Sequence, residues 1–274
     1  MNEFATKPNP IDREIIGLLP AAGQATRLAP LPLSKELYPI GFYADSANQP
    51  KPKVVSHYLL ESMQQAGARK AFFIVRPGKW DIPAYFGDGS RLNLPLGYLT
   101  VHVSYGVPFT LDQAYPFVQQ AQIIFGFPDI LFQPKDAFSH LMAHQTQTHA
   151  DIVLGLFPTE NYHKVGVVEF DDIGRVQQII EKPAQTTLKY MWAIATWMPT
   201  FTQFLHDYLP TCTRDRELPI GDVIQAGIDA GLSVQAVPFA NGSYLDIGTP
   251  DDLAQAIRSA MTEPTQTHSL SEVK

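Results

Sequence analysis

The strongest constraint on the fold is the alternation of short apolar runs with segments of helical pattern. The apolar runs are rich in Val, Ile and Phe, and they cover residues 15–19, 71–75, 99–103, 123–127, 152–157, 165–170 and 234–237. Such short runs are typical of buried strands. Several are separated by helix-like segments, at 54–66, 111–120, 135–149 and 218–230. Strand, helix, strand repetition predicts an α/β fold: a Rossmann-like, doubly wound, mostly parallel sheet with helices on both faces.

The segment VGVVEFDDIGRVQQIIEKP (165–183) has a different pattern. Two apolar stretches meet at a turn of Asp172, Ile173 and Gly174, which is typical of a β-hairpin. We therefore expect an antiparallel insertion after the parallel part of the sheet. No repeat and no Gly/Ser linker interrupts the chain, so we expect one domain over residues 13–261, with loosely ordered termini at 1–12 and 262–274.

The composition argues against several classes of protein. Lys and Arg total 20 against 27 Asp and Glu, a net charge of −7, which disfavours a nucleic-acid partner. The single cysteine, Cys212, excludes an intramolecular disulfide. No stretch approaches the roughly 18 apolar residues of a membrane helix, and the first residues lack the apolar core of a signal peptide. We expect no membrane contact and a cytoplasmic location.

The first apolar run leads directly into a loop of small residues, Ala21, Ala22, Gly23, Gln24 and Ala25. The backbone of such residues can approach a ligand closely. Two cations follow at positions 27 and 35, an arginine and a lysine, and such charges beside free backbone N–H groups suit a polyphosphate. The residue types are equally consistent with an ordinary turn carrying two surface cations. Neither the G-x-x-x-x-G-K-[ST] motif nor G-x-G-x-x-G is present.

The order of motifs in this region resembles the opening signature of the sugar-phosphate nucleotidyltransferases, the sugar-nucleotide pyrophosphorylases such as glucose-1-phosphate thymidylyl- and uridylyltransferases. The opening consists of AAGQATRL followed by SKELYPI. The resemblance continues in FGFPDILF (125–132), in 165–183 and in SYLDIGTPDDL (243–253), so that it spans roughly residues 15–261. Four motifs in order are specific for the superfamily, and less specific for the sugar or the base.

The resemblance implies a reaction and a set of partners. The enzyme would transfer a nucleoside monophosphate from an NTP to a sugar 1-phosphate, with Mg²⁺ as cofactor and release of pyrophosphate. On the nucleotide side, it implies that Ala21, Ala22, Gly23 and Gln24 wrap the triphosphate and that Arg27 and Lys35 bind its phosphates and act in catalysis.

The same resemblance implies the metal and sugar residues. Asp129 and Asp246 match the two carboxylates that hold magnesium. Gly166, Glu181 and Lys182 match the residues that contact the sugar phosphate, with Lys182 holding the nucleophile, so that the antiparallel insertion is the sugar-binding part. Oligomers are common in the family, which makes a homo-oligomer an expectation.

Several of these residues also have a purely structural interpretation. Asp129 follows a proline at a strand end, where turn aspartates are common. Lys182 fits an exposed lysine at a strand end, and Thr249 fits the N-cap of a helix that begins at Pro250. Helical spacing places His140 four residues before His144, which suits a metal, although an exposed helix face explains both better.

The sequence departs from the family pattern in two places, and the second motivates an alternative function. Ala25 stands where the family usually has a second glycine, and we expect it to keep a negative φ. The stretch 104–117 aligns with the part that usually reads the base, with Tyr105 and Thr110 near the places of a glutamine and a glycine. The alternative is a catalytically inactive nucleotide- or sugar-phosphate-binding protein on the same fold.

Overall fold

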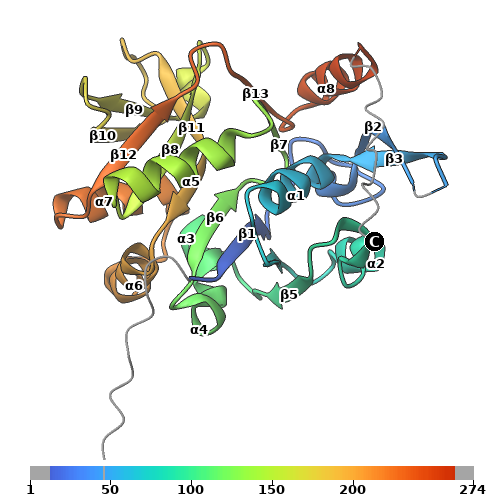
Figure 1. Cartoon of the computed structure of the whole chain (residues 1–274), viewed down its shortest axis with the longest axis horizontal. Helices are drawn as coiled ribbons and strands as arrows, with labels where there is room; N and C mark the ends of the chain where they lie inside the picture. Colours follow the sequence, from blue (N-terminus) through green and yellow to red (C-terminus); the bar gives the residue numbers. More distant parts are fainter. Residues whose placement is uncertain (1–12, 46, 263–274) are drawn as a thin grey trace, which may run out of the picture.

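A computed structural model describes residues 13–45 and 47–262 of the chain. Its centre is a nine-stranded sheet in the order β10-β9-β11-β6-β1-β4-β5, with β8 paired to β11 and β12 to β8 (Figure 1). The strands are β1 (Ile15–Ala21), β4 (Lys70–Val75), β5 (Leu96–Thr100), β6 (Gln122–Gly126), β8 (Ile152–Pro158), β9 (Gly166–Phe170), β10 (Val176–Glu181), β11 (Tyr190–Trp197) and β12 (Val234–Pro238).

The sheet has a parallel part and an antiparallel part that meet at β11. Strand β1 runs parallel to β4 and β6, and β4 runs parallel to β5. Strand β11 is antiparallel to β6, β8 and β9, while β12 is again parallel to β8. The predicted α/β class with an antiparallel insertion is confirmed.

Helices cover both faces of the sheet because alternate residues of β1 point to opposite sides. Ile16 and Leu18 belong to one apolar cluster, together with residues of α3 (Val107–Leu111), α6 (Pro199–Tyr208) and α7 (Ile220–Asp229). Leu19 belongs to the other cluster, with residues of α1 (Val55–Gln65) and α5 (Ala137–Thr148). Figure 1 shows α1 and α5 crossing in front of the sheet, with α6 below them. The doubly wound arrangement follows from this alternation.

The predicted hairpin is formed by β9 and β10. The Asp171 N–H donates to the Arg175 carbonyl over 3.0 Å, and the Gly174 N–H donates to the Asp171 carbonyl over 2.9 Å. Gly174 has a φ of +81°, which a glycine adopts without a steric penalty. The turn therefore lies where the sequence predicts it.

Two short antiparallel pairs stand outside the large sheet and were not expected from the sequence. β2 (Pro39–Ala44) pairs with β3 (Pro50–Val54), and β7 (Ile130–Gln133) pairs with β13 (Ser243–Asp246). After β13 the chain enters α8 (Pro250–Thr262). Thr249 caps this helix, since its Oγ1 accepts the Asp252 N–H over 3.3 Å and donates to the Asp252 carboxylate over 2.6 Å.

Two predicted elements have different bounds in the structure. The strand expected at 99–103 is β5 (Leu96–Thr100), because its partner β4 ends at Val75, which pairs with Thr100. The helix expected at 111–120 is broken into α3, a 3-10 turn (Asp112–Ala114) and α4 (Tyr115–Val118). Pro116 explains the break, since it has no N–H to continue a helix.

The expected loose termini lie outside the described residues, except for Thr262, which ends α8. Among the described helices, none has both the length and the apolar character needed to cross a membrane.

Candidate active site

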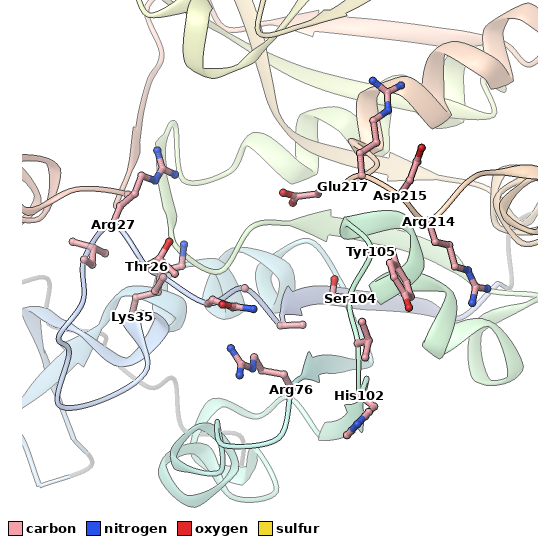
Figure 2. Close-up of a pocket in the computed structure, with 18 residues that line it drawn as sticks. Thr26, Arg27, Lys35, Arg76, His102, Ser104, Tyr105, Arg214, Asp215 and Glu217 are labelled. Carbon is pink, nitrogen blue, oxygen red and sulfur yellow. The ribbon is translucent and has the colours of Figure 1, made fainter.

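A cleft of about 830 Å³ opens at the carboxyl ends of β1, β4 and β5, where ligands bind in doubly wound sheets. Figure 2 shows Arg27 and Lys35 on one side of it, Tyr105 and Arg214 on the other, and Arg76 between them. Its walls come from five segments of the chain: residues 22–28 with Lys35, Arg76, 102–105, 214–217 and Gly248.

The loop of small residues after β1 forms one wall of the cleft. Ala21 ends β1, and both Ala21 and Ala22 are buried, whereas Gly23 and Gln24 are exposed. No atom lies within 4 Å of the position that a Cβ on Gly23 would occupy, so the backbone there faces open space. The loop then turns, with the Leu28 N–H donating to the Ala25 carbonyl over 3.0 Å.

The expectation of a negative φ at Ala25 is wrong. Ala25 has a φ of +51°, in the left-handed region. An L-residue there loses roughly 1–2 kcal/mol to the clash of its Cβ with the backbone. The turn that brings the chain from Gly23 to Arg27 has this backbone conformation at residue 25. Because residue 25 is an alanine and not a glycine, the conformation is strained there.

Lys35 lies at the base of the cleft, in a 3-10 turn (Lys35–Leu37). Its ammonium group forms an ion pair with the carboxylate of Asp129, and the two side chains are only 17% and 13% exposed. Burial alone would lower the pKa of Lys35. The charge and hydrogen bond of Asp129, with the charges of Glu36 and Asp246, raise this pKa above its ordinary value.

The antiparallel pair β7–β13 brings Asp129 and Asp246 together although they are far apart in the sequence. Asp246 pairs with Ile130, the residue after Asp129, and the Ile247 N–H donates to the Asp129 carbonyl over 3.0 Å. Burial raises the pKa of Asp246 to about 6, and the charge of Asp129 adds to this effect against the opposing charges of Lys35 and Arg27. Repulsion between two buried carboxylates is the condition that a cation would relieve.

Asp129 and Asp246 offer the right type of ligand for a divalent metal but too few ligands to complete its coordination. Both are hard oxygen donors, the type that magnesium prefers. Among the described residues there is no cluster of three or more Asp, Glu, His or Cys that could hold a metal ion. A metal here would therefore need further oxygen ligands, such as phosphates or water. The same observation disfavours zinc at His140, which is exposed and lies 3.3 Å from the Asp136 carboxylate.

Arg27 stands close to Asp246 across Gly248. A Cβ on Gly248 would lie 3.5 Å from Arg27 Nη2 and 3.5 Å from both carboxylate oxygens of Asp246. Most of the predicted nucleotide residues gather at one cleft: Ala22, Gly23, Gln24, Arg27 and Lys35 line it, whereas Ala21, the last residue of β1, does not. Asp129 and Asp246 lie beside it, near Lys35 and Arg27.

The predicted sugar residues form a second group. Gly166 and Glu181 are cross-strand partners in the β9–β10 hairpin. A Cβ on Gly166 would lie 2.6 Å from Glu181 Oε1 and 2.9 Å from Trp192 Nε1, so only glycine leaves room for both groups. Lys182 follows with a φ of +48° and an exposed side chain, and its N–H donates to the Val165 carbonyl over 3.0 Å.

The first turn of α7 holds the carboxylate of Glu181. The Gly221 N–H donates to this carboxylate, and a Cβ on Gly221 would lie only 2.0 Å from Glu181 Oε1. Burial raises the pKa of Glu181, and the charge of Asp222 adds to the shift, while Lys182 and the Gly221 N–H oppose it.

The nucleotide residues and the sugar residues are neighbours, but the sugar residues do not line the cleft. None of Gly166, Glu181 and Lys182 lines the 830 Å³ cleft. The segment 214–221 connects them: residues 214–217 line the cleft, and Gly221 contacts Glu181. The segment is attached to the cleft wall through the Leu218 N–H, which donates to the Tyr105 carbonyl over 2.9 Å.

The two altered residues of the base-reading stretch lie in different places, one in the cleft and one outside it. Tyr105 lines the cleft, with the Arg214 guanidinium 5.4 Å from the centre of its ring. Thr110 is buried in α3, where its hydroxyl lies 2.8 Å from Ser104 Oγ and donates to the Gly106 carbonyl over 3.2 Å. Thr110 therefore does not fill the cleft.

Sequence reasoning missed Arg76, Arg214 and Arg216, which all line the cleft. Arg76 had a usable signal, because it directly follows the apolar run 71–75, as the small-residue loop follows 15–19. The two arginines of the segment 214–217 come from a polar loop with no apolar run before it, and nothing in the sequence marks them.

Comparison with known proteins identifies the family. The family model described as "Nucleotidyl transferase" matches residues 16–263. The nucleotidyltransferase Agl11 of low-salt glycan biosynthesis in Haloferax volcanii is 25% identical over 244 residues, covering 88% of this chain and 64% of its own length. A glucose-1-phosphate thymidylyltransferase of Streptomyces griseus is 27% identical over 255 residues, covering 90% of this chain and 67% of its own length.

Solved structures share the fold at low sequence identity. UDP-glucose pyrophosphorylase in complex with UDP-glucose has a TM-score of 0.76 at 16% identity, covering 90% of this chain and 98% of that one. The inositol-1-phosphate CTP transferase from T. maritima has a TM-score of 0.72 at 17% identity, covering 93% and 99%. With a family model that matches nearly all of the described residues, the chain belongs to the nucleotidyl transferase family.

Proposed function

We propose that the chain transfers a nucleoside monophosphate from an NTP to a sugar 1-phosphate, which forms a nucleotide sugar and releases pyrophosphate. The observation that carries the proposal is the meeting of three features at or beside one cleft: the open backbone at Gly23, the cations Arg27 and Lys35, and the neighbouring carboxylate pair of Asp129 and Asp246. Two of the proteins named above, the glucose-1-phosphate thymidylyltransferase and the UDP-glucose pyrophosphorylase, act by their names on substrates of this class.

The nucleotide binds with its phosphates against the loop 21–24. Backbone N–H groups of this loop give directional donors, and Arg27 and Lys35 supply positive charge. An oxygen of the sugar phosphate attacks the α-phosphorus in line, and the bond from that phosphorus to the bridging oxygen of the pyrophosphate breaks. The reaction needs positioning and charge neutralisation more than covalent help, so these cations are placed to stabilise the leaving pyrophosphate.

The family generally uses a divalent metal, and we propose Mg²⁺ held by Asp129 and Asp246 with phosphate oxygens. A bound divalent ion would neutralise phosphate charge in this reaction. In the chain itself, Lys35 already neutralises Asp129, so the ammonium group and a metal compete for the same carboxylate.

The sugar phosphate binds at the β9–β10 hairpin. The carboxylate of Glu181, fixed by the Gly221 N–H, accepts hydrogen bonds from sugar hydroxyls, and the exposed ammonium of Lys182 contacts the phosphate. Gly166 keeps the strand surface free for the sugar. No general base is required, because a sugar phosphate is already ionised at neutral pH.

The inactive alternative has no observation in its favour among the described residues. Its motive was the altered stretch at Tyr105 and Thr110, yet Thr110 is buried outside the cleft and the cleft stays open. The choice of base and sugar, a homo-oligomer, the lack of a nucleic-acid partner and a cytoplasmic location stay predictions.

The test is pyrophosphate release with Mg²⁺ across a matrix of NTPs and sugar 1-phosphates, with Asp129→Asn as the control. Release by the wild-type protein that the control lacks would establish the reaction and name both substrates. No release in any combination, from a folded protein that still binds nucleotide, would replace the proposal by the non-catalytic binder.

A further inference from the structure

Two segments beside the cleft are joined by two pairs of side chains. Ser34 donates from its backbone N–H and from its hydroxyl to the carboxylate of Asp81, over 2.6 and 2.7 Å. Two residues later, the carboxylate of Glu36 accepts a hydrogen bond from the Lys79 ammonium over 2.6 Å. We call the four residues Ser34, Glu36, Lys79 and Asp81 the clasp.

The inner pair of the clasp is buried. The side chains of Glu36 and Lys79 are 2% and 11% exposed. The second carboxylate oxygen of Glu36, Oε2, has no hydrogen-bond partner among the described residues, so Lys79 is the group that compensates its charge. A buried ion pair stabilises a fold little compared with apolar residues of the same volume, which suggests that its value here is the geometry it fixes.

The clasp holds one cation of the cleft on each of its two segments. Lys35 lies between Ser34 and Glu36, and its ammonium points the other way, to Asp129. On the second segment, Arg76 is linked to Lys79 by a turn in which the Lys79 N–H donates to the Arg76 carbonyl over 3.2 Å. The backbone of Glu36 is also fixed, because its carbonyl accepts the Ser56 hydroxyl over 2.7 Å.

Arg76 directs its charge into the cleft. It lines the same cavity as Arg27 and Lys35 (Figure 2). No described carboxylate lies within ion-pair distance of Arg76, whereas Lys35 is paired with Asp129. An unpaired guanidinium in a cleft offers planar paired donors that match a phosphate.

We propose that Arg76 is a further phosphate-binding residue of the cleft and that Glu36 and Lys79 are positioning residues that hold Arg76 and Lys35 as one unit. The inference rests on the proposed function only in taking a polyphosphate as the ligand.

The first test measures binding of magnesium pyrophosphate by calorimetry, which needs neither turnover nor knowledge of the base. Arg76→Ala should weaken binding about 10- to 100-fold, the loss expected for a hydrogen bond to a charged group. Lys70→Ala is the matched control, since Lys70 lies at the other end of β4 and pairs with Glu14 on the surface. Unchanged affinity in Arg76→Ala would remove Arg76 from the site.

The second test separates positioning from folding. The double variant Glu36→Gln with Lys79→Met removes both charges and leaves no buried charge alone. It should weaken pyrophosphate binding by a factor similar to that of Arg76→Ala, and adding Arg76→Ala should then weaken it little further. Lys79→Arg keeps the pair and should retain wild-type affinity. If the double variant does not fold, Ser34→Ala replaces it and should weaken binding in the same way.

Wild-type affinity in the folded double variant, or in Ser34→Ala where that variant replaces it, would reduce the clasp to a structural contact and overturn the positioning role. A wild-type protein that binds no pyrophosphate would overturn the whole inference. Pyrophosphate binding that depends on Arg76, in a protein with no turnover in any substrate combination, would overturn the proposed function and leave the inference standing.

Discussion

The two halves of the candidate site are built on opposite principles. On the nucleotide side (residues 21–28, Lys35, Asp129 and Asp246), charged side chains gather around open space, and the position above Gly23 is empty. On the sugar side (Gly166, Glu181 and Lys182), two glycines leave room for the carboxylate of Glu181. A Cβ would lie 2.6 Å from Glu181 Oε1 if it were added to Gly166 and 2.0 Å from it if it were added to Gly221. The nucleotide side therefore depends on charged side chains, and the sugar side depends on glycines that have no side chain.

Removing a charge should have the largest effect on the nucleotide side. Arg27→Ala should lower the rate about 10²- to 10³-fold, the scale for losing one preorganised group that stabilises charge in the transition state. The KM for the sugar phosphate should stay unchanged. Steady-state kinetics against Lys51→Ala, which alters an exposed pair with Asp45, would check this. An unchanged rate would exclude Arg27 from the mechanism.

The carboxylates should respond next. Asp129→Asn and Asp246→Asn should each raise the Mg²⁺ concentration for half-maximal activity by about tenfold or more, because each removes one hard anionic oxygen. A magnesium titration measures this, with Asp136→Asn as control, since Asp136 is exposed and pairs with His140. Indifference to magnesium in either variant would locate the metal elsewhere.

A methyl group added on the sugar side should have a larger effect than one added on the nucleotide side. The Cβ of Gly166→Ala would lie 2.6 Å from Glu181 Oε1, so the KM for the sugar phosphate should rise roughly tenfold, as crowding costs about 1–3 kcal/mol. The melting temperature should also fall, whereas that of Gly23→Ala should not, because no atom lies within 4 Å of its Cβ position. Equal melting temperatures for the two variants would abolish the contrast between the halves.

The smallest expected effect is the pH dependence of stability. Burial raises the pKa of Glu181, so the folded state binds more protons than the unfolded state above the ordinary value of 4.5. The free energy of unfolding, relative to Glu181→Gln, should therefore fall as the pH rises through that window. Lys35 has the same sign in another pH window: its pKa is also raised, so its contribution is present at neutral pH and is lost only as the pH rises past 10.5. Denaturant unfolding at several pH values checks both signs, and a rise for Glu181 would contradict the first.

Local patterns in the sequence predicted much of the fold. The strand β1, the small-residue loop after it, the hairpin turn at 171–174 and the cap at Thr249 all depend on neighbours within a few residues. The prediction of one continuous helix over 111–120 was wrong because Pro116 interrupts it, and β5 was misplaced because its end is set by β4. Local information fixes the type of an element better than its bounds.

The site required contacts that no local pattern contains. Asp129 and Asp246 meet through β7 and β13, strands of four residues each that pair across more than a hundred residues of sequence. Only the resemblance to the family predicted that they belong together. The clasp escaped prediction because Glu36 and Lys79 are 43 residues apart and meet only in the folded chain.

The central position of β1 also sets the timing of assembly during synthesis. Its two hydrogen-bonded neighbours are β4, some fifty residues later, and β6, more than a hundred residues later. A ribosome must therefore expose residues beyond 126 before the strand that carries the phosphate loop is enclosed on both sides. Pairings over such sequence distances fold slowly, because loop closure precedes the contacts that stabilise it. The loop after β1 thus waits for more than a hundred further residues before its strand is enclosed on both sides.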